Sequence, residues 1–428
     1  MWRFLYTLTL YVLQPFILLF MLIRSIKAPN YRKRLGERYG YYPAGLPAPR
    51  QYGVIIHAAS VGEVIAATPL VRRIQRHYPD LPITLTTVTP TGSDRVKAAF
   101  GDSVTHVYLP YDLPTSLRRF IHFIRPKVCI VIETEIWPNL IHQLYHRGVP
   151  FIIANARLSA RSAVRYGWIK DKLQNMLREI RLIAPQDDIS GKRYQILGYN
   201  PKKLKLTGNI KYDLTITAEL SEKIQALHDS WVKGRFVWVA ASTHEGEEGI
   251  ILETHRILLD SFPDLLLILV PRHPERFNAV AELIKKYRFS YVRRSDNIAP
   301  DRHVQVVLGD TMGELMLMYG ICDVAFVGGS LVKHGGHNPL EPLAFKVPVI
   351  SGKYTFNFPD VFRKLIEVQG VLKVNENSKA LSRAVAIFLT SPQLRKRYGS
   401  AGHEVLIENR GALQRLFDLL RPYLERQV

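Results

Sequence analysis

The sequence predicts an α/β protein built from two Rossmann-like domains. Short apolar runs alternate with helix-like segments along most of the 428 residues, and this βαβ order is typical of parallel sheets. A strand followed by small residues and a glutamate occurs twice, at 54–63 and at 237–247. After each copy come a helix-like segment and a nearly identical return to strand, Tyr78-Pro79-Asp80-Leu81 and Phe262-Pro263-Asp264-Leu265. We therefore expect two similar α/β halves that face each other across a cleft.

The chain length suits two domains of about 150–200 residues each. We expect a membrane anchor and basic tail at 1–38, an N-terminal domain at 39–213 and a C-terminal domain at 214–428, which ends in a helix from His403 to Gln427. A polar, helix-prone connector at 214–233 opens the second half. The expected strands of the first half are Val54–Ile56, Ile83–Thr87, Val104–Leu109, Val128–Ile132, Phe151–Ala154 and Leu182–Ala184. Those of the second half are Phe236–Ala240, Leu265–Val270, Tyr291–Arg293, Val304–Val307, Val324–Val327 and Val347–Ile350.

Residues 4–23 carry no charge and have the length of a bilayer-spanning helix. They are followed by a basic cluster rather than by a small-residue cleavage site, so we expect a retained anchor and not a signal peptide. By the positive-inside rule, the cluster places the rest of the chain in the cytoplasm. The alternative is a buried core helix. Whether the segment crosses the bilayer or lies within one leaflet stays open, as does the oligomeric state.

The formal charge of +21, from 58 basic and 37 acidic side chains, fits nucleic acid, an anionic membrane or acidic substrates as partners. No RNA-binding, helix-turn-helix or zinc-finger signature accompanies the charge, which argues against nucleic acid. Cys129 and Cys322 lie within apolar runs and are expected to be buried thiols of a reducing compartment. Neither a dinucleotide-binding glycine motif nor a Walker A motif is present.

The first half carries three candidate site motifs. Ser60-Val61-Gly62-Glu63 follows a strand, so Glu63 is a candidate general base, or else a first-turn glutamate that complements the helix dipole. Glu133 and Glu135 follow another strand, but we find no histidine or cysteine beside them at metal-ligand spacing and expect hydrogen bonding instead. Lys211, near the junction of the halves, is a candidate fixed positive charge, or else a solvated lysine.

Two candidate anion sites follow strands of the second half. Pro271 and Arg272 come at a strand end, where the arginine offers a planar fork to phosphate or carboxylate. The segment from Gly309 to Leu315, with Met312, Gly313 and Glu314, is expected to open a helix whose free N–H groups receive an anion. The alternative is an ordinary helix cap at Asp310 or Thr311.

The most specific motif is the glycine-rich segment from Phe326 to Pro342. Its glycines let the backbone approach a ligand closely, and Asn338-Pro339-Leu340-Glu341 is expected to begin a helix that binds phosphate, with Glu341 accepting hydrogen bonds from sugar hydroxyls. His334 and His337 are possible metal ligands, but no third ligand stands nearby in the sequence.

These motifs together resemble those of the 3-deoxy-D-manno-octulosonic acid (Kdo) transferases, the lipid A glycosyltransferases of Gram-negative bacteria. The resemblance covers essentially the whole chain, and no family motif is broken. It is carried by the basic tail after the anchor and by the Ser60–Glu63, Glu133–Asn139, Asn155–Ser159, Ser242–Glu247 and Gly336–Pro342 motifs.

The resemblance implies a GT-B fold and an inverting, metal-independent transfer of Kdo from CMP-Kdo to lipid IVA, without a cofactor, at the cytoplasmic face of the inner membrane. Glu63 would be the proton acceptor, and Glu133 and Lys211 would stabilise the transition state. The residues implied to hold CMP are Pro271, Arg272, Met312, Gly313, Glu314, Asn338, Pro339, Leu340 and Glu341. The rivals are another membrane-peripheral GT-B glycosyltransferase and a non-catalytic lipid-binding scaffold. The motifs do not indicate how many Kdo residues are added.

Overall fold

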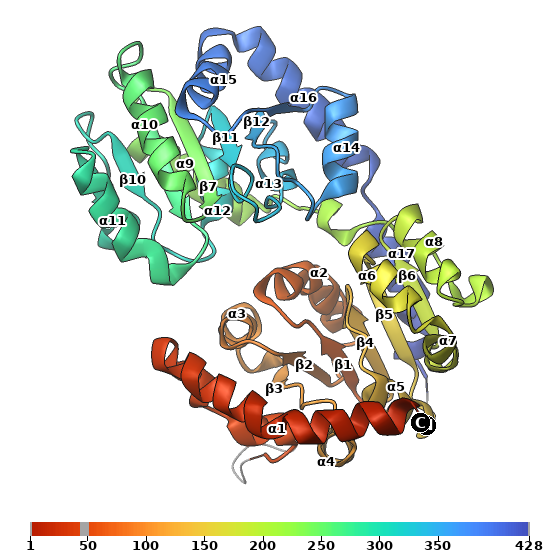
Figure 1. Ribbon diagram of the computed structural model, residues 1–428. Helices are drawn as coiled ribbons and strands as arrows, with labels where there is room; N and C mark the ends of the chain where they lie inside the picture. The colour runs from red at the N-terminus through yellow and green to blue at the C-terminus, as the bar shows by residue number, and fades with distance from the viewer. Residues whose placement is uncertain (1, 43–50, 427–428) are drawn as a thin grey trace. The chain divides into compact units, whose positions relative to one another are not determined.

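The computed structural model describes residues 2–42 and 51–426 and divides into two compact units (Figure 1). Unit 1 comprises Met1–Lys211 with Arg410–Val428, and unit 2 comprises Tyr212–Asn409. Each unit is an α/β domain with one parallel sheet, which confirms the predicted fold class. The chain passes from unit 1 to unit 2 close to the expected boundary at residue 213.

The sheet of unit 1 has the strand order β3-β2-β1-β4-β5-β6, with every pair parallel. Nearly all its strand residues are buried because helices cover both faces, as the continuous apolar runs predict. The strands are β1 Val54–His57, β2 Ile83–Thr87, β3 Thr105–Tyr108, β4 Val128–Ile132, β5 Phe151–Ala156 and β6 Leu182–Pro185. The helices are α1 Trp2–Lys27, α2 Val61–His77, α3 Pro90–Phe100, α4 Pro114–Ile124, α5 Pro138–Tyr145, α6 Ala160–Gly167, α7 Lys170–Glu179, α8 Asp188–Ile196 and α17 Ala412–Leu424.

The sheet of unit 2 has the order β13-β12-β11-β7-β8-β10-β9 and is also parallel throughout. The expected strands of this half are all present, with ends that differ by a few residues from the predicted ones, and β13 was not predicted from the sequence. The strands are β7 Val237–Thr243, β8 Leu266–Pro271, β9 Tyr291–Arg293, β10 Val306–Leu308, β11 Val324–Val327, β12 Val349–Ser351 and β13 Val371–Lys373. The helices are α9 Ala218–Trp231, α10 Glu247–Leu259, α11 Phe277–Lys286, α12 Leu315–Gly320, α13 Leu340–Leu343, α14 Pro359–Glu367, α15 Ser378–Thr390 and α16 Pro392–Glu408.

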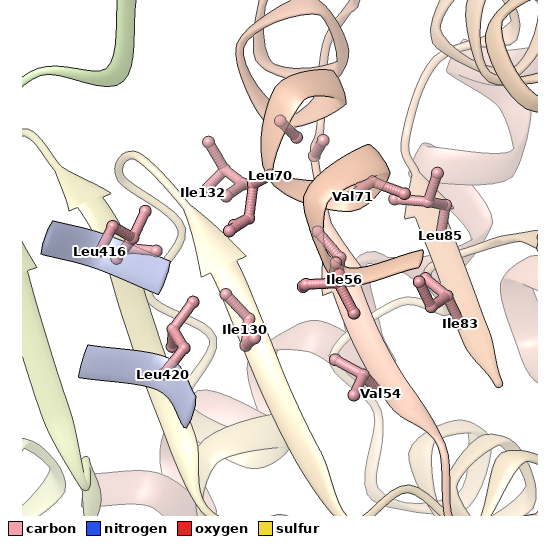
Figure 2. Packing of buried hydrophobic residues seen from close by; sticks show 14 of the residues in the cluster. Val54, Ile56, Leu70, Val71, Ile83, Leu85, Ile130, Ile132, Leu416 and Leu420 are labelled. Atoms are coloured by element: carbon pink, nitrogen blue, oxygen red, sulfur yellow. The ribbon is translucent and has the colours of Figure 1, made fainter. Parts of the chain in front are cut away.

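The end of the chain differs from the expected single helix in the C-terminal domain. It forms α16 in unit 2 and α17 in unit 1, separated at Gly411, whose φ of 88° favours glycine. Helix α17 belongs to unit 1 because its apolar face is buried there. Figure 2 shows Leu416 and Leu420 of this helix in one core cluster with Ile130 and Ile132 of β4.

Helix α1 is long and apolar enough to cross a membrane over Trp2–Ile26, with a mean hydropathy of 1.9. Only 6 % of its most apolar stretch is buried in the structure. Its first three turns contact unit 1 through polar side chains: the Tyr6 hydroxyl donates to Asp112 at 3.0 Å, and Tyr11 lies 2.8 Å from the hydroxyl of Thr115. The apolar surface that α1 leaves exposed fits a lipid environment better than water.

Candidate active site

Each sheet has a switch point, where the strand order runs outward in two directions, and ligands bind outside the carboxyl ends of the strands there. In unit 1 the switch point lies between β1 and β4, and in unit 2 between β7 and β11. Glu63 follows β1 and Glu133 follows β4. The strand order thus brings the two predicted glutamates of unit 1 to one place, although 70 residues of chain separate them.

Glu63 lies in the first turn of α2, where Ser60 is the N-cap. Its carboxylate accepts the Ala59 N–H at 2.7 Å and the Ser60 hydroxyl at 3.0 Å, an arrangement that differs from a capping box in using the N–H of the residue before the N-cap. Burial first, and then the negative charge of Glu133, raise the pKa of Glu63 to about 7. The side chain therefore caps the helix, as one prediction has it, and its raised pKa is compatible with the other prediction, that of a general base.

Glu133 adopts a left-handed backbone conformation with φ of 66°, which is rare for a residue with a side chain and is common where function constrains the chain. Its carboxylate accepts a hydrogen bond from Lys211 Nζ at 2.6 Å. Both side chains are mostly buried, with 14 % and 19 % of their surface exposed. The three residues predicted to act in unit 1 are thus brought together in unit 1.

The position of Lys211 is fixed by buried amides on the segment before it. The side chain of Asn155, fully buried at the end of β5, accepts the Ile210 N–H at 3.1 Å, and Asn209 accepts the Lys211 N–H at 3.0 Å. The second carboxylate of the motif, Glu135, accepts the indole N–H of Trp137 at 2.6 Å. Glu135 thus takes part in hydrogen bonding, as expected.

At the switch point of unit 2, Glu247 occupies the place that Glu63 has in unit 1. Its carboxylate is fully buried and accepts the N–H groups of Gly329, Ser330 and Leu331, at 2.7, 3.0 and 2.9 Å. A fourth bond comes from the His244 N–H at 2.9 Å. Glu247 therefore holds the glycine-rich segment in place. The sequence reading missed this role, although the repeated strand-to-glutamate pattern pointed to the residue.

Arg272 is half-buried directly after β8, and its N–H donates to Thr243 O at 3.0 Å. Burial lowers the pKa of its guanidinium, while the charge of Glu341 acts in the opposite direction. In the Asn338–Glu341 motif, the Asn338 side chain accepts the Leu340 N–H at 3.1 Å and donates to the Glu341 carboxylate at 3.2 Å. Arg272 and the Asn338–Glu341 motif thus lie in one electrostatic neighbourhood of unit 2.

Two helix starts differ from the expectations for unit 2. Helix α12 begins at Leu315, so neither Asp310 nor Thr311 caps it; Asp310 instead accepts hydrogen bonds from Ser295. Glu314 forms a two-pronged ion pair with Arg294, at 2.8 and 3.0 Å, which orders the loop and leaves Met312 exposed at its tip. Helix α13 has only four residues, of which Leu340, Pro342 and Leu343 are buried. It is too short to supply the expected phosphate-binding helix end.

A cluster of histidines surrounds the glycine-rich segment. His244 Nε2 lies 2.7 Å from His337 Nε2, and the ring of His334 stacks on His244 with centroids 4.1 Å apart. Burial, with contributions from neighbouring cations including Arg272, lowers the pKa of His244 to about 4 and that of His337 to about 3. These rings are therefore neutral hydrogen-bonding groups near pH 7.

Apart from the Glu133 motif, unit 1 holds one group of possible metal ligands that was not predicted from the sequence. His142 and His146 lie four residues apart at the end of α5, and Glu179 of α7 lies beside them. The i, i+4 spacing was the missed signal, since it places two imidazoles on one face of a helix.

The sequence comparisons agree with this geometry. Residues 33–214 match the family model described as 3-Deoxy-D-manno-octulosonic-acid transferase (kdotransferase), and residues 237–405 match Glycosyl transferases group 1. The 3-deoxy-D-manno-octulosonic acid transferase of Haemophilus influenzae is 66 % identical over the full length of both chains. That of Bordetella pertussis is 35 % identical over 99 % of this chain and all of its own.

Solved structures share the fold at low identity. A UDP-GlcNAc 2-epimerase from Neisseria meningitidis superposes with a TM-score of 0.58 at 14 % identity, covering 87 % of this chain and 99 % of its own. A glycosyltransferase from Rickettsia africae gives 0.54 at 14 %, covering 88 % and 98 %. The two parallel-sheet units are thus of the GT-B type. The chain belongs to the 3-deoxy-D-manno-octulosonic acid (Kdo) transferase family and is a glycosyltransferase that transfers Kdo.

Proposed function

We propose that the enzyme transfers Kdo from CMP-Kdo to a hydroxyl group of lipid IVA, with inversion at the anomeric carbon and without a metal ion. Unit 2 holds the donor and unit 1 supplies the proton acceptor. The observation that carries the proposal is the environment of Glu63, a glutamate at a sheet switch point whose pKa is raised to about 7 by burial and Glu133.

In the proposed reaction, the acceptor hydroxyl oxygen forms a bond to the anomeric carbon of Kdo and gives its proton to the Glu63 carboxylate. The bond from that carbon to the CMP phosphate oxygen breaks, and its electron pair leaves with the phosphate. One direct displacement inverts the configuration. A pKa near the working pH suits this role, because the carboxylate is both available as a base and basic enough to accept the proton.

The Lys211–Glu133 ion pair supports a role in stabilising the transition state. Lys211 is held at 2.6 Å by a mostly buried partner, so it contributes a fixed positive charge without a large reorganisation of the site. In unit 2 the half-buried Arg272 has the planar donor geometry that binds phosphate in two-pronged fashion. We assign the leaving phosphate to Arg272, and the rest of CMP to Pro271, Met312–Glu314 and Asn338–Glu341, the segments that the family resemblance points to.

We assign the enzyme to the cytoplasmic face of the inner membrane, attached through α1. The exposed apolar surface of this helix and the net charge of +21 support an anionic lipid surface as the partner. The proposed acceptor is itself a lipid, so attachment keeps the enzyme at the surface where that acceptor resides.

The test is to incubate the purified full-length enzyme with CMP-Kdo and lipid IVA and to weigh the lipid product by mass spectrometry. We expect the acceptor mass to rise by one or more Kdo residues, and the increment counts the sugars added. Full turnover in excess chelator is expected for metal-independent transfer. An unchanged acceptor mass would contradict the proposed substrates.

The rival glycosyltransferase reading predicts faster nucleotide release from a donor other than CMP-Kdo. Measuring nucleotide release with several nucleotide-sugar donors separates the two. A non-catalytic scaffold predicts that Glu63→Gln leaves function intact, whereas the enzyme reading predicts a large loss of turnover with folding preserved.

A further inference from the structure

Three metal-ligand side chains gather at one end of α5 and α7, within unit 1. His142 lies on α5, His146 is the residue that ends it, and Glu179 is the last residue of α7. One ligand atom from each lies within 4.8 Å of the others. His142 Nδ1 is 3.0 Å from Glu179 Oε1, and the two imidazole centroids are 4.1 Å apart. Within 2–42 and 51–426, no other group of histidine, cysteine and acidic residues reaches this proximity.

We propose that His142, His146 and Glu179 bind one divalent transition-metal ion, with Zn²⁺ as the preferred ion. Two imidazole nitrogens and one carboxylate oxygen form a common zinc ligand set, to which a water molecule adds the fourth ligand. Mg²⁺ and Ca²⁺ fit less well because they favour ligand sets made of oxygen atoms. His142 and Glu179 are partly buried and His146 is exposed, so the group is preformed and open to solvent.

The surrounding backbone also favours a cation. Both helices end at the group, and a helix C-terminus carries a partial negative charge from its unpaired carbonyl groups. A bound ion would join α5 to α7, two helices that pack on the same side of the sheet in one core cluster. Its primary effect is therefore on the stability of unit 1.

The group lies at the opposite end of α5 from the Glu133 motif. Helix α5 begins at Pro138, five residues after Glu133, and has eight residues, which amount to about 12 Å of helix. The ion therefore does not touch the reacting atoms. This site is separate from the proposed function and is compatible with a metal-independent transfer.

The binding test uses full-length enzyme in detergent micelles, purified through a tag that contains no histidine and stripped with chelator. We expect calorimetry with Zn²⁺ to give one equivalent per chain, and Co²⁺ to give absorption bands of nitrogen and oxygen coordination. His146→Ala and Glu179→Gln should each weaken binding at least tenfold. The matched control is His122→Ala, which removes an exposed histidine of α4 outside the group and should bind as the wild type does.

Stability gives a second readout. At free Zn²⁺ about 100-fold above Kd, the melting temperature of wild type and of His122→Ala should rise by about 5 °C, and that of His146→Ala should not. The proposal is overturned by binding well below one equivalent, by equal binding in His146→Ala, or by binding that His334→Ala abolishes, which would trace it to unit 2. Loss of turnover in chelator that Zn²⁺ restores in the wild type alone would overturn the purely structural role.

Discussion

Glu63 and Glu247 occupy corresponding places in two similar units. Each follows the strand at the switch point of its sheet and lies in the first turn of the next helix. Glu247 is fully buried and accepts four backbone N–H groups, three of them from the glycine-rich segment that follows β11. Glu63 accepts two local hydrogen bonds and has the negative charge of Glu133 as its neighbour.

The difference shows that the loop after the neighbouring strand decides what the glutamate does. After β11, the N–H groups of Gly329, Ser330 and Leu331 point toward the carboxylate, and a carboxylate with these hydrogen bonds stabilises the local structure. Near β4, burial and then the negative charge of Glu133 disfavour the charged form of Glu63, so its pKa rises to about 7. The same strand-to-glutamate pattern thus provides a structural hydrogen-bond acceptor in unit 2 and a candidate general base in unit 1.

The largest effect that would test this contrast is on turnover. Glu63→Gln keeps the size of the side chain and an oxygen that can accept the Ala59 N–H, but it cannot take a proton. We expect turnover of Kdo transfer to fall by about 10²–10⁴-fold, with the melting temperature almost unchanged. Product formation is followed by mass spectrometry, and thermal unfolding serves as the control. Turnover near that of the wild type would remove Glu63 from the chemistry.

The opposite pattern is expected in unit 2. Glu247→Gln replaces one charged oxygen by an NH₂ group that faces backbone donors, and it should lower the unfolding free energy of unit 2 by about 3 kcal/mol. Glu245→Gln is the matched control, because that neighbouring side chain is 88 % exposed. Denaturant titration measures both variants. Equal stability of the two variants would show that Glu247 does not hold the glycine-rich segment.

Most of the fold was predictable because strands buried on both faces leave continuous apolar runs. The ends of the strands and the repeated strand-to-glutamate pattern could be predicted for the same reason. The assignment of α17 to unit 1 was not, since an amphipathic helix pattern does not name the surface that buries it. The four-residue length of α13 also escaped prediction, because Asn338-Pro339 is a valid helix start that does not fix where the helix ends.

Within the site, the residues at the strand ends could be predicted, but their partners could not. The ion pair of Glu133 with Lys211 joins positions 78 residues apart. Asn155 accepts the N–H of Ile210, the residue before Lys211, and this long-range hydrogen bond could not be predicted from the Asn155–Ser159 motif alone. The different roles of Glu63 and Glu247 could not be predicted either, because both residues follow a strand and differ only in the loop that lies beside them.

The pH dependence of stability sharpens the contrast with a smaller effect. The folded pKa of Glu63, about 7, lies above its ordinary value of 4.5, so its stabilising contribution is complete below about pH 4.5 and is lost as pH rises through 7. The unfolding free energy of the wild type relative to Glu63→Gln should therefore fall by roughly 3 kcal/mol over that interval. Denaturant titrations at several pH values measure the difference. A constant difference would mean that Glu63 has an ordinary pKa.

The smallest expected effect isolates the contribution of Glu133 to the base. Because Glu63 acts as a carboxylate, turnover should rise with pH through about 7 in the wild type. Glu133→Gln removes the neighbouring negative charge, so the pKa of Glu63 falls and the acidic limb of the turnover profile moves to lower pH. The shift should be about one pH unit or less, since burial is the larger cause and remains.

Turnover itself falls as well in Glu133→Gln, because Lys211 loses its partner. The acidic limbs are therefore compared after each profile is scaled to its own maximum. Glu135→Gln, which removes the weaker neighbouring charge, should move the limb less than Glu133→Gln does. An acidic limb that stays in place in Glu133→Gln would mean that burial alone raises the pKa of Glu63. Glu133 would then be needed only to hold Lys211.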